Sequence, residues 1–118
     1  MTRRGALFHV GALPAEALAA SARFYAQALP ELLAELADEA HCMTLVFDPA
    51  DHTHAGWRLA LVQQLARRYA PLRINAIASD DKAAIAAAAE FVAEADGLTG
   101  QLLALDGNGA DKVLYNDV

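Results

Sequence analysis

The chain has 118 residues, and 56% of them are hydrophobic, which is enough for the core of one domain and excludes a disordered chain. The formal net charge at pH 7 is −6, which argues against nucleic-acid binding and attraction to an anionic membrane, because both need basic side chains. Cys42 is the single cysteine, so an internal disulfide is excluded. Since no apolar run reaches the ~20 residues that span a bilayer, we expect a cytoplasmic protein.

The first third of the chain predicts a strand followed by a helix. Residues 6–10 form a short apolar run that ends at a glycine, which is typical of a buried strand. Pro14 suits the first turn of a helix, and residues 15–28 are rich in helix formers. Because proline has no backbone N–H, we expect Pro30 to kink or briefly break this helix before it continues over residues 31–37.

The rest of the chain repeats this alternation of apolar runs and helical segments. The apolar runs are continuous, as expected for strands that are covered on both faces. Trp57, Leu61 and Leu65 share one face of the next predicted helix, and Ser79 or Asp80 is expected to cap the helix after it. The predicted elements are a strand at residues 43–47, a helix at 56–69, a strand at 72–78, a helix ending near residue 95, and a strand at 101–105.

Strands that alternate with helices over short links indicate a parallel sheet, because parallel strands need crossover connections. We therefore expect a single α/β domain over residues 1–118, with a Rossmann-like parallel sheet of about four strands and flanking helices. Residues 107–118 are expected to form an arm or a short edge strand, with residues 113–115 as their only apolar part. Gly107 and Gly109 lie too near the end of the chain for the helix of a phosphate-binding motif, so they predict a turn.

The most polar cluster follows the second predicted strand, where residues 48–54 read DPADHTH. Open α/β sheets bind ligands at the carboxyl ends of their strands, so this cluster and the ends of neighbouring strands form a candidate ligand rim. Imidazole and carboxylate groups there could ligate zinc or another divalent ion. However, two histidines in an i, i+2 pair have no second motif to complete a site, and we predict a solvated loop without a metal. The rim residues are His9, Asp48, Asp51, His52, His54 and Asp80.

Two segments of the second half resemble a known family. Residues 65–78 read LARRYAPLRINAIA, and residues 91–107 read FVAEADGLTGQLLALDG. They resemble the C-terminal half of a short-chain dehydrogenase/reductase, in which a strand reading roughly Arg-Val-Asn-Ala-Ile precedes a Thr-Gly-Gln and an Asp-Gly-Gly. More weakly, residues 6–11 resemble the family's strand ending in Asn-Asn-Ala-Gly, and residues 24–33 its helix ending in Ala-Leu-Pro. The chain thus resembles a truncated form of that fold, without the first half that carries the cofactor site.

The resemblance also locates the positions of the family's chemistry, which is proton transfer from a tyrosine that a nearby lysine activates. Asp51 stands at the tyrosine position, Ala55 at the lysine position and Ala17 at the position of an assisting asparagine. A carboxylate cannot replace a phenol with a pKa of about 10, and an alanine cannot perturb a neighbouring group. We therefore predict no catalytic residue, no cofactor-binding residue and no bound cofactor.

The resemblance further implies self-association, because family members commonly dimerise through the helices that match residues 15–37 and 56–69. These helices carry more apolar surface than one face of a sheet needs, and the first strand is expected to leave an unpaired edge. We expect a homodimer or a higher homo-oligomer, or alternatively a complex with a full-length family member. The candidate interface residues are Phe24, Tyr25, Trp57, Leu61 and Leu65.

The sequence favours a non-catalytic domain, a pseudoenzyme that acts as a self-associating interaction module or as a partner subunit. The alternative is a small-molecule or metal-binding protein, including an enzyme of unrelated chemistry, that uses the candidate ligand rim. A third hypothesis is a dehydrogenase completed in trans by a separate half with the glycine-rich turn. Asp51 and Ala55 argue against this third hypothesis.

Overall fold

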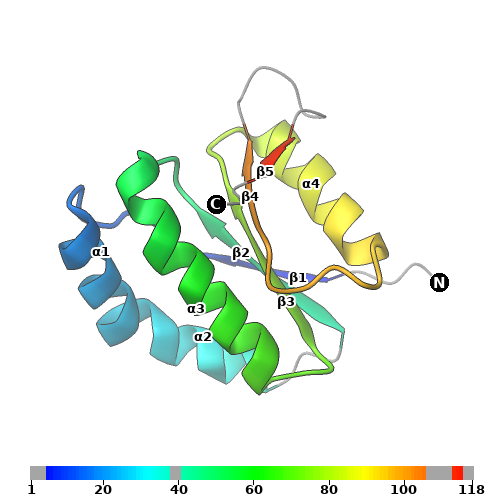
Figure 1. Ribbon diagram of the computed structural model, residues 1–118. Coiled ribbons are helices and arrows are strands. Elements are labelled where there is room, and N and C mark those ends of the chain that lie inside the picture. The colour runs from blue at the N-terminus through cyan, green and yellow to red at the C-terminus, as the bar shows by residue number, and fades with distance from the viewer. Residues whose placement is uncertain (1–4, 38–40, 106–112, 116–118) are drawn as a thin grey trace.

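The computed structural model describes residues 5–37, 41–105 and 113–115, which form one sheet with helices on both faces (Figure 1). The order of the strands is β1-β2-β3-β4-β5. The first four strands are parallel, and the fifth runs antiparallel to the fourth. The predicted four-stranded parallel sheet is therefore confirmed. The strands are β1 Ala6–His9, β2 Cys42–Phe47, β3 Arg73–Ala78, β4 Leu102–Leu105 and β5 Val113–Tyr115.

The helices are divided unequally between the two faces of the sheet. Three α-helices and a π-helical segment cover one face, and a single helix covers the other (Figure 1). The division follows the strand periodicity: Leu45 and Ala76 point into the larger core cluster, whereas their neighbours Val46 and Ile77 pack against the single helix. The helices of the first face are α1 Ala17–Arg23, the π-helix η1 Phe24–Ala28, α2 Leu29–Leu36 and α3 Ala55–Arg68; the opposite face carries α4 Lys82–Glu94.

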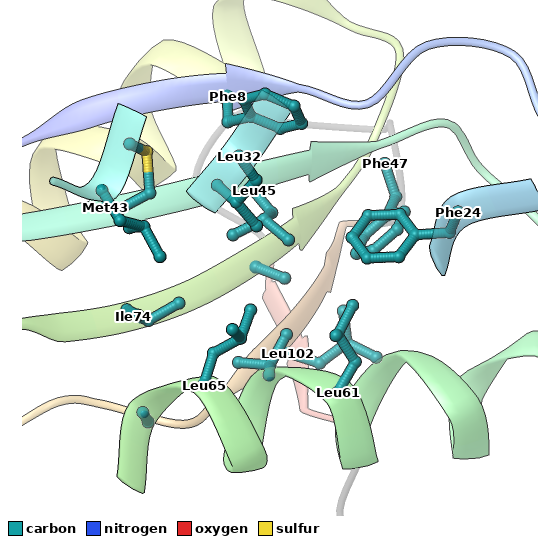
Figure 2. Close-up of a cluster of buried hydrophobic side chains, with 14 of the residues drawn as sticks. Phe8, Phe24, Leu32, Met43, Leu45, Phe47, Leu61, Leu65, Ile74 and Leu102 are labelled. Atoms are coloured by element: carbon teal, nitrogen blue, oxygen red, sulfur yellow. The ribbon is translucent and has the colours of Figure 1, made fainter. Parts of the chain in front are cut away.

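The larger core cluster lies between the sheet and the helices of the first face. Figure 2 shows Leu61 and Leu65 of α3 pointing toward Ile74 and Leu102 of the sheet. Phe24 contributes a fully buried ring that lies 5.9 Å from the ring of Phe47, centroid to centroid. These contacts bury the apolar stripe that the sequence predicted for residues 56–69, so α3 is positioned by its burial against β3 and β4.

Pro30 acts on the turn before it rather than breaking the helix. The chain from Ala17 to Leu36 remains helical, but Phe24–Ala28 widens into a π-helix immediately before α2 begins. Proline provides no N–H for an i→i−4 hydrogen bond, and its ring collides with the carbonyl four residues earlier. A π-helical turn relieves both problems by shifting the hydrogen-bond pattern by one residue. The expected irregularity is present, and its form is a widened turn.

The connection from β3 to β4 differs in hand from the two connections before it. The strands β1 to β4 follow one another in the same direction across the sheet, yet α4 packs on the face opposite to α1, α2 and α3. Crossover connections between parallel strands share one hand in nearly all proteins, so this connection must be held by specific contacts.

Arg73 provides those contacts at the C-terminal end of α4. Its guanidinium donates hydrogen bonds to the backbone carbonyls of Val92, Ala93, Ala95 and Leu98, at 2.8 to 3.2 Å. Carbonyls that lie at the end of a helix can accept such additional donors, and a cation is favoured there by the helix dipole. The carbonyls of Val92 and Ala95 also accept from the backbone N–H groups of Ala95 and Leu98.

Asn75 fixes the segment that follows. Its Nδ2 donates to the carbonyl of Leu98 at 3.0 Å, and its Oδ1 accepts from the backbone N–H of Gln101 at 3.0 Å. Gly100 adopts a positive φ of 73° within this turn, a conformation that glycine tolerates. The turn is thereby aligned so that β4 can pair with β3.

The cap of α4 lies later in the chain than the sequence suggested. The N-cap residue is Asp81, whose side chain accepts from the backbone N–H of Ala83 at 3.2 Å. Ser79 lies two residues earlier and accepts from the N–H of Asp81 at 3.1 Å, so it shapes the turn into the helix. The prediction that Ser79 or Asp80 is the cap was therefore wrong, because a serine–aspartate turn precedes the helix.

The C-terminal segment forms the short edge strand that was one of two expectations for it. β5 pairs with β4 in an antiparallel register, with Leu114 opposite Ala104. The predicted glycine turn at Gly107 and Gly109 lies outside the described residues.

Replacing Arg73 with methionine should lower the free energy of unfolding by about 3 kcal/mol, because buried carbonyls lose charged hydrogen-bond donors. Urea denaturation followed by circular dichroism measures this change. Arg67→Met is the matched control, since Arg67 is exposed on α3 and its loss should change stability by less than about 0.5 kcal/mol. Equal effects of the two substitutions would contradict the role assigned to Arg73.

Candidate functional site

A cavity of about 290 Å³ opens at the carboxyl ends of β1 and β2. One wall is the loop between β1 and α1, residues 11–15, and the other is the loop after β2, residues 48–51. His54 and Arg58, from the start of the α3 region, complete the lining. This is the edge of a parallel sheet at which open α/β folds bind ligands. We refer to it below as the Arg58 cavity.

Asp51 forms hydrogen bonds within the turn that leads from β2 to α3. Its carboxylate accepts hydrogen bonds from the backbone N–H of Thr53, at 3.0 Å, and from the Thr53 hydroxyl. These bonds, the hydroxyl contact first, lower the pKa of Asp51 below its ordinary value, and the charges of His54 and His52 act in the same direction. Asp51 therefore caps the short 3₁₀ turn His52–His54 that leads into α3.

His54 links the two loops that line the cavity. The indole Nε1–H of Trp57 donates to Nδ1 of His54 at 3.2 Å. The other ring nitrogen, Nε2, lies 2.9 Å from the carbonyl oxygen of Ala15 and must be its donor. Both nitrogens are thus occupied within the chain, so His54 bridges the two loops rather than serving as an open metal ligand.

The candidate ligand rim is only partly brought together. Asp48, Asp51 and His54 line the Arg58 cavity, whereas the other three predicted rim residues are exposed and do not line it. Within the described residues, no group of three or more histidine, cysteine, aspartate or glutamate side chains could hold a metal ion. The rim residues outside the cavity are His9, His52 and Asp80.

Arg58 lines this cavity, although the sequence did not lead us to predict it as a site residue. It is 6% exposed, and its guanidinium lies over the ring of Phe47, 4.4 Å from the ring centroid. Burial lowers the pKa of Arg58, while the carboxylate of Asp48 opposes that shift. A sequence signal for it did exist, because Arg58 shares helical spacing with the buried residues Val62 and Leu65, where a charge is unusual.

The predicted interface residues are distributed between the core and the surface. Phe24, Leu61 and Leu65 are buried within this chain, and Trp57 is half-buried. Tyr25 is the exposed member, at 44%. The helices therefore keep most of the predicted apolar residues for their own packing.

A model of the SDR-like family, described as short chain dehydrogenase-like protein, matches residues 8–105. The chain belongs to this family. The match extends from β1 to β4, so it includes every element that lines the Arg58 cavity. No curated protein and no solved structure matches the chain. The resemblance recognised in residues 65–78 and 91–107 is thus confirmed, and the fold agrees with an SDR-like domain. Among the described helices, none has the length and apolar character to cross a membrane.

Replacing His54 with alanine should lower the free energy of unfolding by about 2 kcal/mol, because the Trp57 indole and the Ala15 carbonyl both lose a partner. Urea denaturation monitored by tryptophan fluorescence measures both the stability and the environment of Trp57. His52→Ala is the control, because His52 is exposed on the same turn and should change stability by less than about 0.5 kcal/mol. A comparable loss in both variants would refute the bridging role of His54.

Proposed function

We propose that this SDR-like protein is a non-catalytic domain that associates with a second copy of itself. The observation that carries the proposal is an apolar cavity of about 220 Å³ on the outer surface of η1, α2 and α3. Tyr25, 44% exposed, and Leu33, 37% exposed, stand beside it. Exposed apolar side chains around one concave surface are typical of a protein–protein interface. We call this surface the helix-face cavity.

A second copy suits this surface because a twofold arrangement would bring the same residues of both chains together. The lining is contributed by two helical segments, with Leu29 and Leu33 on one side and Leu61 and Leu65 on the other. The lining also includes the polar side chains of Gln64 and Arg68, and interfaces usually combine apolar and polar groups. A full-length relative that presents the same helices is the other partner that fits this surface.

The edge of the sheet supports assembly independently of the helices. Among the described residues β1 pairs with β2 alone, so the outer side of β1 presents backbone groups that no other strand contacts. Leu7 on this strand is 39% exposed. Native proteins cover or pair such edges, and a higher oligomer could use this second surface.

The positions of the family's catalytic residues argue against oxidoreductase activity. The resemblance puts Asp51 and Ala55 where the family has its tyrosine and lysine, and the Asp51 carboxylate is held by Thr53. A carboxylate that remains ionised at neutral pH cannot donate the proton that a phenol donates. The composition, with its single cysteine, favours a cytoplasmic location for this non-catalytic role.

Isothermal titration calorimetry with NAD(H) and NADP(H) should give no saturable binding, and carbonyl substrates should not be reduced. The reason is that the resemblance includes neither the glycine-rich turn nor the tyrosine–lysine pair. Micromolar binding, equivalent to about −8 kcal/mol, would contradict the non-catalytic assignment.

Sedimentation velocity at low micromolar concentration should give a species with twice the mass of one chain. Leu33→Glu should shift it toward the monomer, because a charge in the helix-face cavity would be buried without a partner. Leu18→Glu is the matched control, since Leu18 is 75% exposed on α1 and does not line the cavity. A monodisperse monomer for the unmodified protein, or equal effects of both substitutions, would refute the helix-face interface.

A further inference from the structure

Arg58 is a buried side chain whose guanidinium forms no hydrogen bond with a described residue, and its Nε is sealed from solvent. Its side chain is 6% exposed, and Nε has no hydrogen-bond partner. No described residue forms a hydrogen bond or an ion pair with this guanidinium; its recorded contacts are with aromatic rings. A sealed N–H donor without a hydrogen bond is costly, whereas the terminal N–H groups remain accessible. Proteins retain such a group where something else supplies the partner, and Arg58 lines a cavity.

The aromatic contacts hold the guanidinium in a defined orientation. Its central carbon lies 4.4 Å from the centroid of the Phe47 ring and 5.9 Å from that of Trp57. A guanidinium that stacks on aromatic rings is stabilised through its flat faces, and its N–H groups, which point outward in its plane, can still donate hydrogen bonds. Trp57 is itself held by its hydrogen bond to His54. The cation is therefore fixed by packing before any ligand arrives.

The loop after β2 contributes negatively charged side chains to the cavity that Arg58 lines. Asp48 and Asp51 both line the Arg58 cavity, and Asp48 is close enough to influence Arg58 electrostatically without forming an ion pair. The cavity thus combines one cation with two carboxylates. Two carboxylates repel phosphates and other polyanions, but they attract an ammonium group, while the arginine edge matches a carboxylate.

We propose that the Arg58 cavity binds a small zwitterion of the amino-acid type, with its carboxylate on Arg58 and its ammonium group facing Asp48 and Asp51. The volume of about 290 Å³ is at the small end of ligand cavities, which suits a compact molecule. The bidentate geometry of arginine orients the carboxylate, and the presence of both charges in one small cavity selects a ligand that carries both. This site is separate from the helix-face cavity, so it does not depend on self-association.

The experiment is a thermal-shift screen of the full chain with the twenty L-amino acids, followed by calorimetry of the best ligand. We expect one or a few of them to raise the melting temperature saturably. The amide of that ligand, which lacks the carboxylate, and its analogue without the amine should each bind about tenfold more weakly or worse. Inorganic phosphate is the comparison probe and should not bind.

Two substitutions separate a ligand-binding role of Arg58 from a structural one. Arg58→Met should abolish amino-acid binding while leaving the ligand-free melting temperature unchanged or higher, because a partnerless buried charge is replaced by an apolar group. Asp48→Asn should weaken binding about tenfold and leave the binding of the analogue without the amine unchanged. Arg67→Met, on the exposed end of the same helix, is the control and should bind normally.

Several results would overturn the proposal. They are the absence of any saturable shift with the amino acids, equal binding by the unmodified protein and by Arg58→Met, and saturable phosphate binding. A marked loss of stability in ligand-free Arg58→Met would also overturn it, because it would show that Arg58 is a structural residue. None of these outcomes bears on the oligomeric state, so the failure of this proposal is distinguishable from failure of the self-association proposal.

Discussion

The hydrogen bonds of Arg73 to the end of α4 are the contacts on which the second half of the fold depends. They attach the end of α4 and the turn after it to the start of β3, on the face of the sheet that a single helix covers. The alignment of β4 follows, since Gly100 donates to the carbonyl of Ile74 and Ala76 donates to that of Gln101. β5 depends in turn on β4 for its only pairing among the described strands. One buried cation at the start of β3 thus organises an entire edge of the sheet, and Asn75 supplies the second anchor.

The two faces of the sheet are covered by different numbers of helices, so the surfaces that they present to solvent differ. Where three helices pack together, the aromatic rings of Phe24, Phe47 and Trp57 contact one another in the interior. On the other face α4 packs over β2 and β3, and Phe91 of this helix is exposed. A parallel sheet is normally covered on both faces. The single helix α4 packs over β2 and β3, and Leu7 of β1 remains exposed. The helix-face cavity and the β1 edge are therefore separate surfaces.

Most of the fold could be predicted from the sequence because it depends on local patterns. Continuous apolar runs at residues 43–47 and 72–78 and the stripe of Leu61 and Leu65 are sufficient to predict parallel strands and a helix packed on them. Features that depend on contacts distant in the chain could not be predicted. The opposite face of α4 is such a feature. The π-helical turn before Pro30 and the cap at Asp81 are local, but neighbouring residues offered alternatives between which the sequence does not decide. Arg73 illustrates the difference, because its role requires carbonyls some twenty residues later in the chain.

The candidate site shows why a cluster of polar residues in a sequence is an uncertain guide to function. Asp51 and His54 have the chemistry of ligands, yet the fold uses Asp51 to cap a turn and His54 to join two loops. Both ring nitrogens of His54 are engaged, so His54 gains little from binding another group, because each new bond would replace an existing one. The hydrogen bonds of Asp51 involve its Oδ1, so the carboxylate still offers negative charge to a cation. Arg58 has the opposite character: it is buried, charged and held by aromatic rings that provide no hydrogen-bond acceptor oxygen. The unpaired Nε–H of Arg58 is therefore the stronger physical indication of a binding site, because a buried donor without a hydrogen bond carries a cost that a satisfied one does not.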